Sequence, residues 1–530
     1  MFTCKYVLPV LVFLSGVIGC AFGLKTASGD LFLFSLFGTI FFFLIDFFAL
    51  FMKYAWKKNL FHELDQILFA SSKTRQKSIL YLFIALLILI CILPMGLSPY
   101  WNGQKPQHRD QYEIMADSIL DGHLYMDLYV DPILTSLENP YNLQARKDSG
   151  AYYYWDHAFY NQHYYMYFGV VPVFLTFIPY RLITGSPLTT YHATQLYAAL
   201  IIIGTFALFA LLVKRFFRSL SFGRYMALSA SFSVISIWFS VGFPSLYCTA
   251  ITCAICLMIW SLYFFVRAVF ISPTENRQIL CAFVGSLLGA LAFGCRPPIA
   301  LANLLVLPLL ITYLKGRKFT LRLFFKLLVA AFPYLVIAIL LMVYNYLRFD
   351  NPFEFGQSYQ LTVTDQSQYI HSLSTFNAGQ TLTSLLSNFF APLFPPKYGG
   401  AFMNFPLLLS VFGVFSPSVR NTLKAHRLHH FAYGLFLVPI VITFMDIMWS
   451  PYLLERYRMD IYFLMGILSF LVLCCYSTQA SKNSRVYDFL TFGLPLFSVF
   501  TCAILFLIPH DYNFTHYAIL AIQRRLSSPL

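Results

Sequence analysis

Apolar residues occur along this chain in long runs that short polar connections separate. A helix needs about 20 apolar residues to cross the hydrocarbon core of a bilayer, and these runs match that length. Up to fourteen such segments are predicted, at residues 6–24, 31–52, 78–97, 166–184, 191–213, 225–243, 246–267, 279–295, 298–314, 327–346, 402–416, 431–448, 461–476 and 487–508. The pattern therefore predicts an all-α polytopic membrane protein with about 13–14 membrane segments.

The first of these runs follows Lys5, and no small-residue cleavage site separates it from the next run. We expect it to be retained as a span and not removed as a signal peptide. The composition agrees with a membrane protein, since 59% of the residues are apolar and 11% are charged, against about 25% charged in soluble domains.

The net charge of +14 comes mostly from short connections between the predicted spans. Short loops rich in Lys and Arg stay in the cytoplasm, so this charge indicates orientation and not nucleic-acid binding. The basic connections lie at residues 53–77, 214–224, 315–326, 420–430 and 481–485. The two long hydrophilic stretches, 98–165 and 347–401, are then expected on the outer face, each with short amphipathic helices.

These stretches divide one membrane domain into five parts. We expect N-terminal spans at 1–97, a first outer loop at 98–165, central spans at 166–346, a second outer loop at 347–401 and C-terminal spans at 402–530. The orientation requires an odd number of crossings between residues 98 and 214, yet two apolar segments lie there. Pro172 and Pro179 make 166–184 the candidate for an irregular or re-entrant segment. All eleven cysteines lie in or beside apolar runs, so no disulfide framework is predicted.

Acidic residues are concentrated in the first outer loop, which holds nine of the 22 in the chain. In "RDQYEIMADSILDG" the acids recur at helical spacing, which predicts a short amphipathic helix on the membrane surface with its acids toward solvent or a cleft. Most of these acids are expected to do no more than solvate an exposed face. Asp110 and Glu113 are the stronger catalytic candidates, because they stand at the helix start, where the dipole favours a carboxylate.

The stretch "GAYYYWDHAFYNQHYYMYFG" (150–169) contains ten aromatic residues. Tyr and Trp also anchor proteins at membrane interfaces, and this explains its second half. Its first half mixes rings with polar groups, as a site for a ring-shaped polyol does. The candidate sugar-binding residues there are Tyr154, Trp155, His157, Tyr160 and Asn161, with Asp156 as a further candidate acid.

The second outer loop repeats this mixture in "RFDNPFEFGQSYQLT" (348–362), where Glu354, Gln357 and Tyr359 are candidate substrate ligands. An ordinary turn-rich connection is the alternative there. Three arginines next to predicted spans could offer their guanidinium forks to a phosphate. These are Arg296 in "FGCRPPIA" and Arg456 and Arg458 in "SPYLLERYRMD", for which contact with lipid headgroups is the alternative.

Taken in order along residues 78–460, these motifs resemble the multi-span GT-C glycosyltransferases. Protein O-mannosyltransferases and lipid A aminoarabinose transferases belong to that superfamily, and the likeness is strongest to bacterial members of unassigned acceptor. It rests on "RDQYEIMADSILDGHLY", "YYWDHAFYNQHYYMYFGVVPV", "GCRPP" and "ERYRMD". One departure is that "GFPSLYCTAI" (242–251) lacks the further acid that several relatives carry after a later span.

The resemblance implies transfer of a sugar from a polyprenyl-phosphate donor to an acceptor hydroxyl on the outer face of a bacterial cell membrane, with inversion. Asp110 would be the base, with Glu113 and Asp156 as further catalytic candidates, and Arg296 and Arg456 would hold the leaving phosphate. The acceptor would be a cell-envelope glycan, lipid or protein, and membrane lipids would surround the protein. No metal or other cofactor is predicted, because no cluster has ligand spacing.

Two other classes of function compete with this interpretation. The span count also suits a lipid or glycolipid transporter or flippase, which predicts charged residues near mid-membrane and paired repeats. Asp46 is the one such residue singled out in the sequence. A binding or assembly protein could keep the outer cleft without the chemistry.

Overall fold

The computed structural model describes residues 4–25, 29–60, 69, 74–97, 110–369, 377–393, 398–449, 453–478 and 485–507. Helices make up most of this part, and eleven of them are long and apolar enough to cross a membrane. The protein is thus an all-α polytopic membrane protein, as the apolar runs predict. A single two-stranded hairpin is the β-structure with named strands within the described residues.

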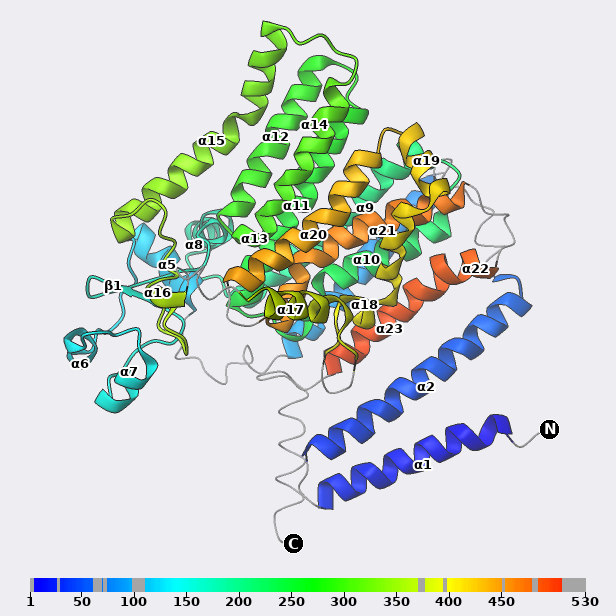
Figure 1. Cartoon of the computed structure of the whole chain (residues 1–530), viewed down its shortest axis with the longest axis horizontal. Helices are drawn as coiled ribbons and strands as arrows, with labels where there is room; N and C mark the ends of the chain where they lie inside the picture. The colour runs from blue at the N-terminus through cyan, green and yellow to red at the C-terminus, as the bar shows by residue number, and fades with distance from the viewer. Residues whose placement is uncertain are drawn as a thin grey trace.

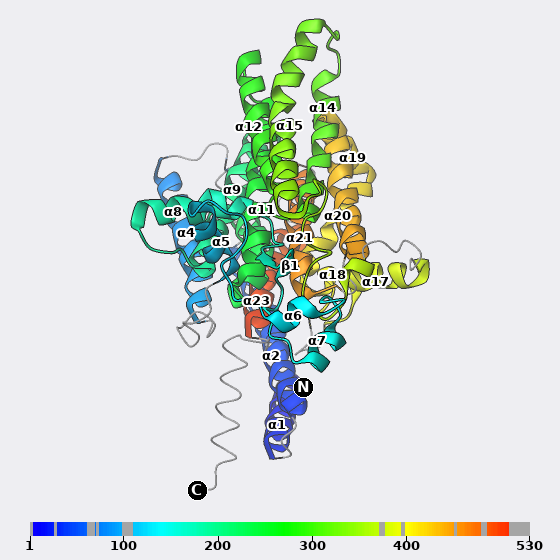
Figure 2. The ribbon, with the colours of Figure 1, turned by 90° about the vertical axis from the view of Figure 1, so that its left-hand side faces the viewer.

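Most helices of the membrane part pack as a bundle with their ends on two opposite faces, and the first two helices form a pair at its edge (Figures 1 and 2). Their bounds are α1 (Cys4–Lys25), α2 (Gly29–Lys57), α4 (Thr74–Ile92), α9 (Thr190–Phe216), α10 (Phe222–Gly242), α11 (Leu246–Phe270), α12 (Glu275–Phe293), α13 (Pro297–Ala300), α14 (Val306–Leu314), α15 (Leu321–Phe349), α20 (His429–Trp449), α21 (Met459–Ser477), α22 (Arg485–Asp488) and α23 (Leu494–Leu507). Helices α10, α11 and α21 are buried almost throughout, and α21 contacts α10, α11 and α20. These helices form the centre of the core.

Two predicted spans are shorter than a membrane crossing. Residues 166–184 contain a π-helical turn (Val173–Phe177) followed by α8 (Ile178–Thr184). Together they rise about 18 Å, well below the roughly 30 Å of a hydrocarbon core. This segment is the irregular one of its pair, as its two prolines indicate. The predicted span at 402–416 is wrong as a full crossing, because α18 (Ala401–Asn404) is followed by a 3-10 helix of ten residues, Pro406–Phe415.

Both long hydrophilic stretches carry short helices on one face of the bundle, which we call the loop face. The first stretch has α5 (Gln111–Leu120), α6 (Pro132–Ser136) and α7 (Leu143–Ser149), and the second has α16 (Gln366–Tyr369) and α17 (Ala378–Phe390). In α5 the apolar side is buried through Tyr112, Met115 and Ala116, as its pattern predicts. Leu120, which helical spacing places on that side, is exposed at the last position of the helix.

The aromatic stretch folds as a β-hairpin that joins the two outer stretches. Strands β1 (Ala158–Tyr160) and β2 (His163–Tyr165) pair antiparallel around a two-residue turn, Asn161 and Gln162, both in the left-handed region. The backbone N–H of Phe159 donates to the carbonyl of Tyr359 (2.9 Å), and that of Leu361 donates to His157 (2.9 Å). Residues 157–159 and 359–361 are therefore held together by main-chain hydrogen bonds.

Helix α11 connects the loop face to the opposite face. At 1.5 Å per residue its 25 residues span about 37 Å. Its first turn lies beneath the hairpin, and its last turn lies beside the end of α9 and the short helix α19 (Pro417–Ala425). Most of the basic connections meet there, so we call this end the basic face.

Candidate functional site

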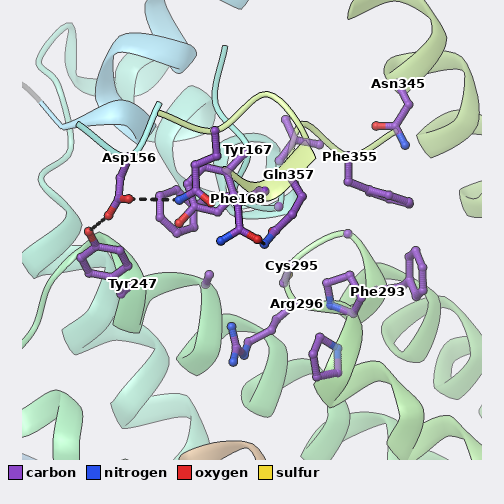
Figure 3. A pocket seen from close by; sticks show the side chains of 18 of the residues that line it. Asp156, Tyr167, Phe168, Tyr247, Phe293, Cys295, Arg296, Asn345, Phe355 and Gln357 are labelled. Carbon is purple, nitrogen blue, oxygen red and sulfur yellow. Dashed lines mark hydrogen bonds between the residues drawn. The ribbon is translucent and has the colours of Figure 1, made fainter. Parts of the chain in front are cut away.

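A cavity of 310 Å³ lies beneath the hairpin on the loop face (Figure 3). The ends of α11, α12, α15 and α20 line it together with both outer stretches and the 3-10 turn Glu455–Arg458. Its polar and aromatic lining includes Trp155, Asp156, Tyr247, Arg296, Gln357, Gln360, Asp446, Arg456 and Tyr457. The cavity thus collects side chains from across the whole sequence.

Asp156 is the acid that the outer stretches contribute to this cavity. One carboxylate oxygen accepts a hydrogen bond from the hydroxyl of Tyr247, and the other accepts one from Nε2 of Gln360 (3.0 Å). Its backbone carbonyl accepts from Nε2 of Gln111 (2.7 Å), and its N–H donates to Leu361 (3.0 Å). Figure 3 shows the carboxylate held between α11 and the loops.

The backbone of Asp156 is strained, since its φ of 56° lies in the left-handed region that residues other than glycine seldom adopt. Such strain persists only where surrounding contacts hold it, and it is concentrated at functional sites. Burial raises the pKa of this carboxyl above its usual value, while the Tyr247 hydrogen bond and the charge of Arg456 act in the opposite direction. Asp156 is therefore an acid whose proton affinity is set by its surroundings.

Arg456 supplies a cation to the same cavity. Its guanidinium lies 4.2 Å from the ring centroid of Tyr247 and 5.4 Å from that of Tyr457. None of the ion pairs found among the described residues involves Arg456. Because this guanidinium stacks on rings and forms no close ion pair among the described residues, its fork can contact an anion.

Arg296 also lines the cavity, but two buried acids already contact it. Its Nε donates to Oδ2 of Asp460 (2.7 Å), and its Nη2 lies 3.7 Å from Oδ1 of Asp446. Its guanidinium also stacks over Tyr457 at 4.6 Å. These contacts make Arg296 the centre of a buried cluster, and its predicted contact with a phosphate stays a prediction. Arg458 is buried and lies outside the lining set.

Asp110 lies away from the cavity that Asp156 lines, although the next residue, Gln111, donates a hydrogen bond to the carbonyl of Asp156. It precedes α5 as the N-cap residue, and its Oδ2 accepts a hydrogen bond from Thr190 at the start of α9 (2.7 Å). The side chain is buried, and burial raises its pKa to about 6. Neither Asp110 nor Glu113 is among the residues that line the cavity.

The predicted sugar-binding residues separate into two groups. Trp155 and Gln357 line the cavity. The others lie in the hairpin and its packing and outside that lining set: Tyr154, His157, Tyr160, Asn161, Glu354 and Tyr359. Among these, the rings of Tyr160 and Tyr359 lie 4.6 Å apart. Most of the aromatic residues thus hold the outer stretches together.

Several residues of the cavity lining are not among the predicted site residues, and three of them bear on its chemistry. Asp446 lies in an apolar run and was counted as part of a span, and Tyr247 lies in "GFPSLYCTAI", where an acid was sought. Gln360 belongs to the polar pattern of the second outer stretch, but that pattern does not indicate that it faces Asp156. An acid within an apolar run is a functional candidate by default, and that rule could have selected Asp446.

One group of side chains in the described residues has ligand atoms close enough for a metal ion, namely Asp121, His123 and Asp127, within 4.8 Å of one another. Two of the three are exposed, and none lines the cavity.

No known protein family matches the sequence, and no curated protein matches it. Among solved structures, the chain is similar to the oligosaccharyltransferase of Archaeoglobus fulgidus in the apo form, with a TM-score of 0.35 and 12% sequence identity. The likeness covers 83% of this chain and 54% of that one, so it reaches about half the length of the archaeal protein. Helix content and length define the present protein as an integral multi-pass membrane protein.

Proposed function

We propose that this protein is a membrane glycosyltransferase that uses a polyprenyl-phosphate-linked sugar, and that the cavity on the loop face is its active site. The observation that carries the proposal is the position of Asp156. It is a strained, half-buried carboxylate with a raised pKa, and it shares the cavity with the cation of Arg456. A base and an anion-binding group beside aromatic and amide side chains are the parts that sugar transfer from a phosphate needs.

In the proposed step, an acceptor hydroxyl attacks the anomeric carbon of the donor sugar. The new C–O bond forms as the bond from that carbon to the phosphate oxygen breaks, with inversion, and the electron pair leaves with the polyprenyl phosphate. Asp156 receives the hydroxyl proton, and Arg456 stabilises the charge that develops on the departing phosphate. The acceptor is a hydroxyl of a glycan, lipid or protein on the loop face, which we place outside the cell.

Asp156 takes the role of base that the sequence resemblance assigned to Asp110. A base must reach the proton that it removes, and Asp156 lines the cavity whereas Asp110 faces Thr190 inside the protein. Trp155, next to Asp156, offers a ring on which an apolar sugar face can stack. Gln357 and Gln360 offer amides to sugar hydroxyls in the same space.

The test is an assay of purified protein in nanodiscs with synthetic polyprenyl-phosphate hexoses, in which released polyprenyl phosphate is measured. We expect D156N to lower the rate at least about 100-fold, because it removes the base. The donor retained after gel filtration, measured by mass spectrometry, should stay the same. D148N is the matched control, since Asp148 is an exposed acid of the same outer stretch.

Arg456→Gln should weaken donor retention about tenfold, because a charge-assisted contact to phosphate is lost. Lys147→Gln removes an exposed charge from the same face and should leave retention unchanged. A D156N variant that releases polyprenyl phosphate at the wild-type rate would exclude Asp156 as the base. Retention of the donor without release in the wild type would favour a binding protein.

A further inference from the structure

A second cavity, of 420 Å³, lies on the basic face, at the other end of α11 from the proposed active site. The last turns of α9, α11 and α14 line it, together with the connections that follow α14 and α19. Its polar lining is made by Arg215, Tyr313, Lys315, Arg317, His426 and Arg427. From Tyr247 to Val269 along α11, the two cavities are about 33 Å apart.

The cations of this cavity come from three of the basic connections that the sequence analysis assigned to orientation. Arg215 belongs to 214–224, Lys315 and Arg317 to 315–326, and Arg427 to 420–430. Orientation requires that such charges stay on one side of the membrane, but it does not require that they meet. Four cations converging on one cavity from three distant segments go beyond that requirement.

These four charges form no close ion pair in the described residues. No acid lines the cavity, and none of the ion pairs found there involves Arg215, Lys315, Arg317 or Arg427. A nearby acid, Glu275, is paired with Lys326 and lies outside the cavity lining, although the charge of Arg317 also acts on it from a longer distance. Like charges brought together without counter-charges repel one another, so this arrangement is favourable when an anion occupies the cavity.

Local contacts aim the guanidinium groups and still leave N–H donors free. Nε of Arg215 donates to the carbonyl of Phe270 (3.1 Å), which leaves its terminal nitrogens available. Arg317 stacks 4.0 Å over the ring of Tyr313. Its Nη1 donates to the hydroxyl of Tyr313 (3.2 Å) and its Nη2 to Oε1 of Gln278 (3.4 Å), which leaves its other N–H groups available. Arg427 stands in the left-handed region with a φ of 59°, where a residue with a Cβ is strained.

His426 completes the lining as a neutral group. Burial and the charge of Arg215 lower its pKa, and its ring packs edge-on against Phe216 and Phe217. Its imidazole can therefore donate one hydrogen bond without adding to the positive charge.

We propose that this cavity binds a phosphate-bearing anion at the basic face. Guanidinium forks match the oxygens of a phosphate, and a cluster of Lys and Arg beside span ends is what anionic headgroups bind to. Two sources offer this chemistry, namely the headgroup of an anionic phospholipid and a soluble phosphate or pyrophosphate. The proposal stands apart from the proposed transfer reaction, because it rests on residues at the opposite face.

The test uses the full chain with three cavity charges removed together, R215Q, K315Q and R317Q. The control removes three exposed cations of the same face from outside the cavity, R218Q, R322Q and R420Q, so that both proteins lose the same charge. Native mass spectrometry measures phosphatidylglycerol retained from vesicles of phosphatidylglycerol and phosphatidylcholine. A thermal-shift titration in phosphatidylcholine nanodiscs measures binding of inorganic pyrophosphate.

We expect the cavity variant to lose at least about tenfold in affinity for one of the two probes, while the control variant stays within about threefold of wild type. Loss for phosphatidylglycerol alone identifies a lipid headgroup as the ligand, and loss for pyrophosphate alone identifies a soluble phosphate. Equal affinities of the cavity and control variants for both probes would overturn the proposal. The melting temperatures without ligand show that both variants fold.

Discussion

Two acids of the loop face, Asp110 and Asp156, show how similar chemistry is put to different use. Burial raises the pKa of both, and Gln111 connects their segments by a hydrogen bond to the Asp156 carbonyl. Asp110 faces Thr190 inside the protein, whereas Asp156 faces the cavity and Arg456. The enclosed Asp110 and the cavity-lining Asp156 therefore both have a raised pKa. The position of each carboxyl, inside the protein or at the cavity, is what distinguishes them.

The difference has a local cause. Asp110 precedes a helix whose buried residues Tyr112 and Met115 pack into the core, and the first turn carries the acid inward with them. Asp156 lies in irregular chain, where a left-handed backbone turns the carboxylate toward Tyr247. The dipole at a helix start favours a carboxylate, but the helix start does not by itself orient that carboxylate toward a substrate.

The largest expected effect concerns Asp110 and the pH dependence of stability. Its pKa is raised to about 6 in the folded protein, so folding favours the protonated acid. This contribution is complete below the unfolded pKa of about 4 and is lost as the pH rises through about 6. The loss corresponds to about 3 kcal/mol. In the wild type, this loss lowers the melting temperature as the pH rises from 4 to 7. We expect D110N to remove the contribution of Asp110 to that fall, as measured by melting curves across this pH range.

D148N is the control variant, because it changes an exposed acid. Its melting temperature should depend on pH as that of the wild type does. A D110N protein whose melting temperature follows pH as the wild type does would show that Asp110 is not enclosed. Its transfer rate should stay within about tenfold of wild type, in contrast with D156N.

A smaller effect is expected at Gly169, where the chain leaves the hairpin and passes the turn before Arg296. A Cβ there would overlap the backbone carbonyls of Gly294 and Cys295. We expect Gly169→Ala to lower the free energy of unfolding by about 2 kcal/mol and to lower the transfer rate, because the cavity wall must move. Gly38→Ala is the control, since no atom lies within 4 Å of its Cβ.

Gly169→Ala also tests whether Asp110 and Asp156 act independently. The wall that it displaces lines the cavity of Asp156, whereas Asp110 lies outside that lining set. D110N should change the slope of melting temperature against pH. We expect this change to be the same in the wild-type protein and in the Gly169→Ala protein. A change in that difference would mean that the two acids are coupled.

The smallest effect is expected from Tyr247→Phe, which removes one hydrogen bond to Asp156 and leaves the Thr190 contact of Asp110 in place. A hydrogen bond donated to a carboxylate lowers its pKa, so its loss raises the pKa of Asp156 further. We expect about a tenfold lower rate near pH 7 and an acid limb of the pH–rate profile shifted to higher pH. Tyr129→Phe, at an exposed position, should shift neither.

Much of the fold could be predicted from the sequence because membrane spans are long and local. The apolar runs predict the spans, the acid spacing predicts α5, and Pro172 and Pro179 mark the irregular segment 173–184. The failure at 402–416 has a physical reason, since a run of apolar residues gives hydrophobicity but not helix length. A 3-10 helix with proline at its start uses the same composition.

The arrangement of the site could not be predicted in the same way. The contact that places Asp156 joins residues about 200 positions apart through main-chain hydrogen bonds, which no side-chain pattern encodes. The pairing of Arg296 with Asp446 and Asp460 also joins residues far apart in sequence. The composition of the aromatic stretch serves both the packing of Tyr160 on Tyr359 and the cavity wall at Trp155, so it does not distinguish the two roles.

The antiparallel pairing of the hairpin with residues 359–361 has a consequence for how the protein can be labelled or altered. Side chains alternate between the two sides of a strand, so one inserted residue between Asp156 and Tyr160 would reverse the sides and move the carboxylate off its partners. The turn at Asn161 and Gln162 lies beyond the last paired residues, where added chain leaves the register intact. An epitope tag or a fluorophore can therefore be inserted at that turn, whereas an insertion within 156–160 would disturb the position of Asp156.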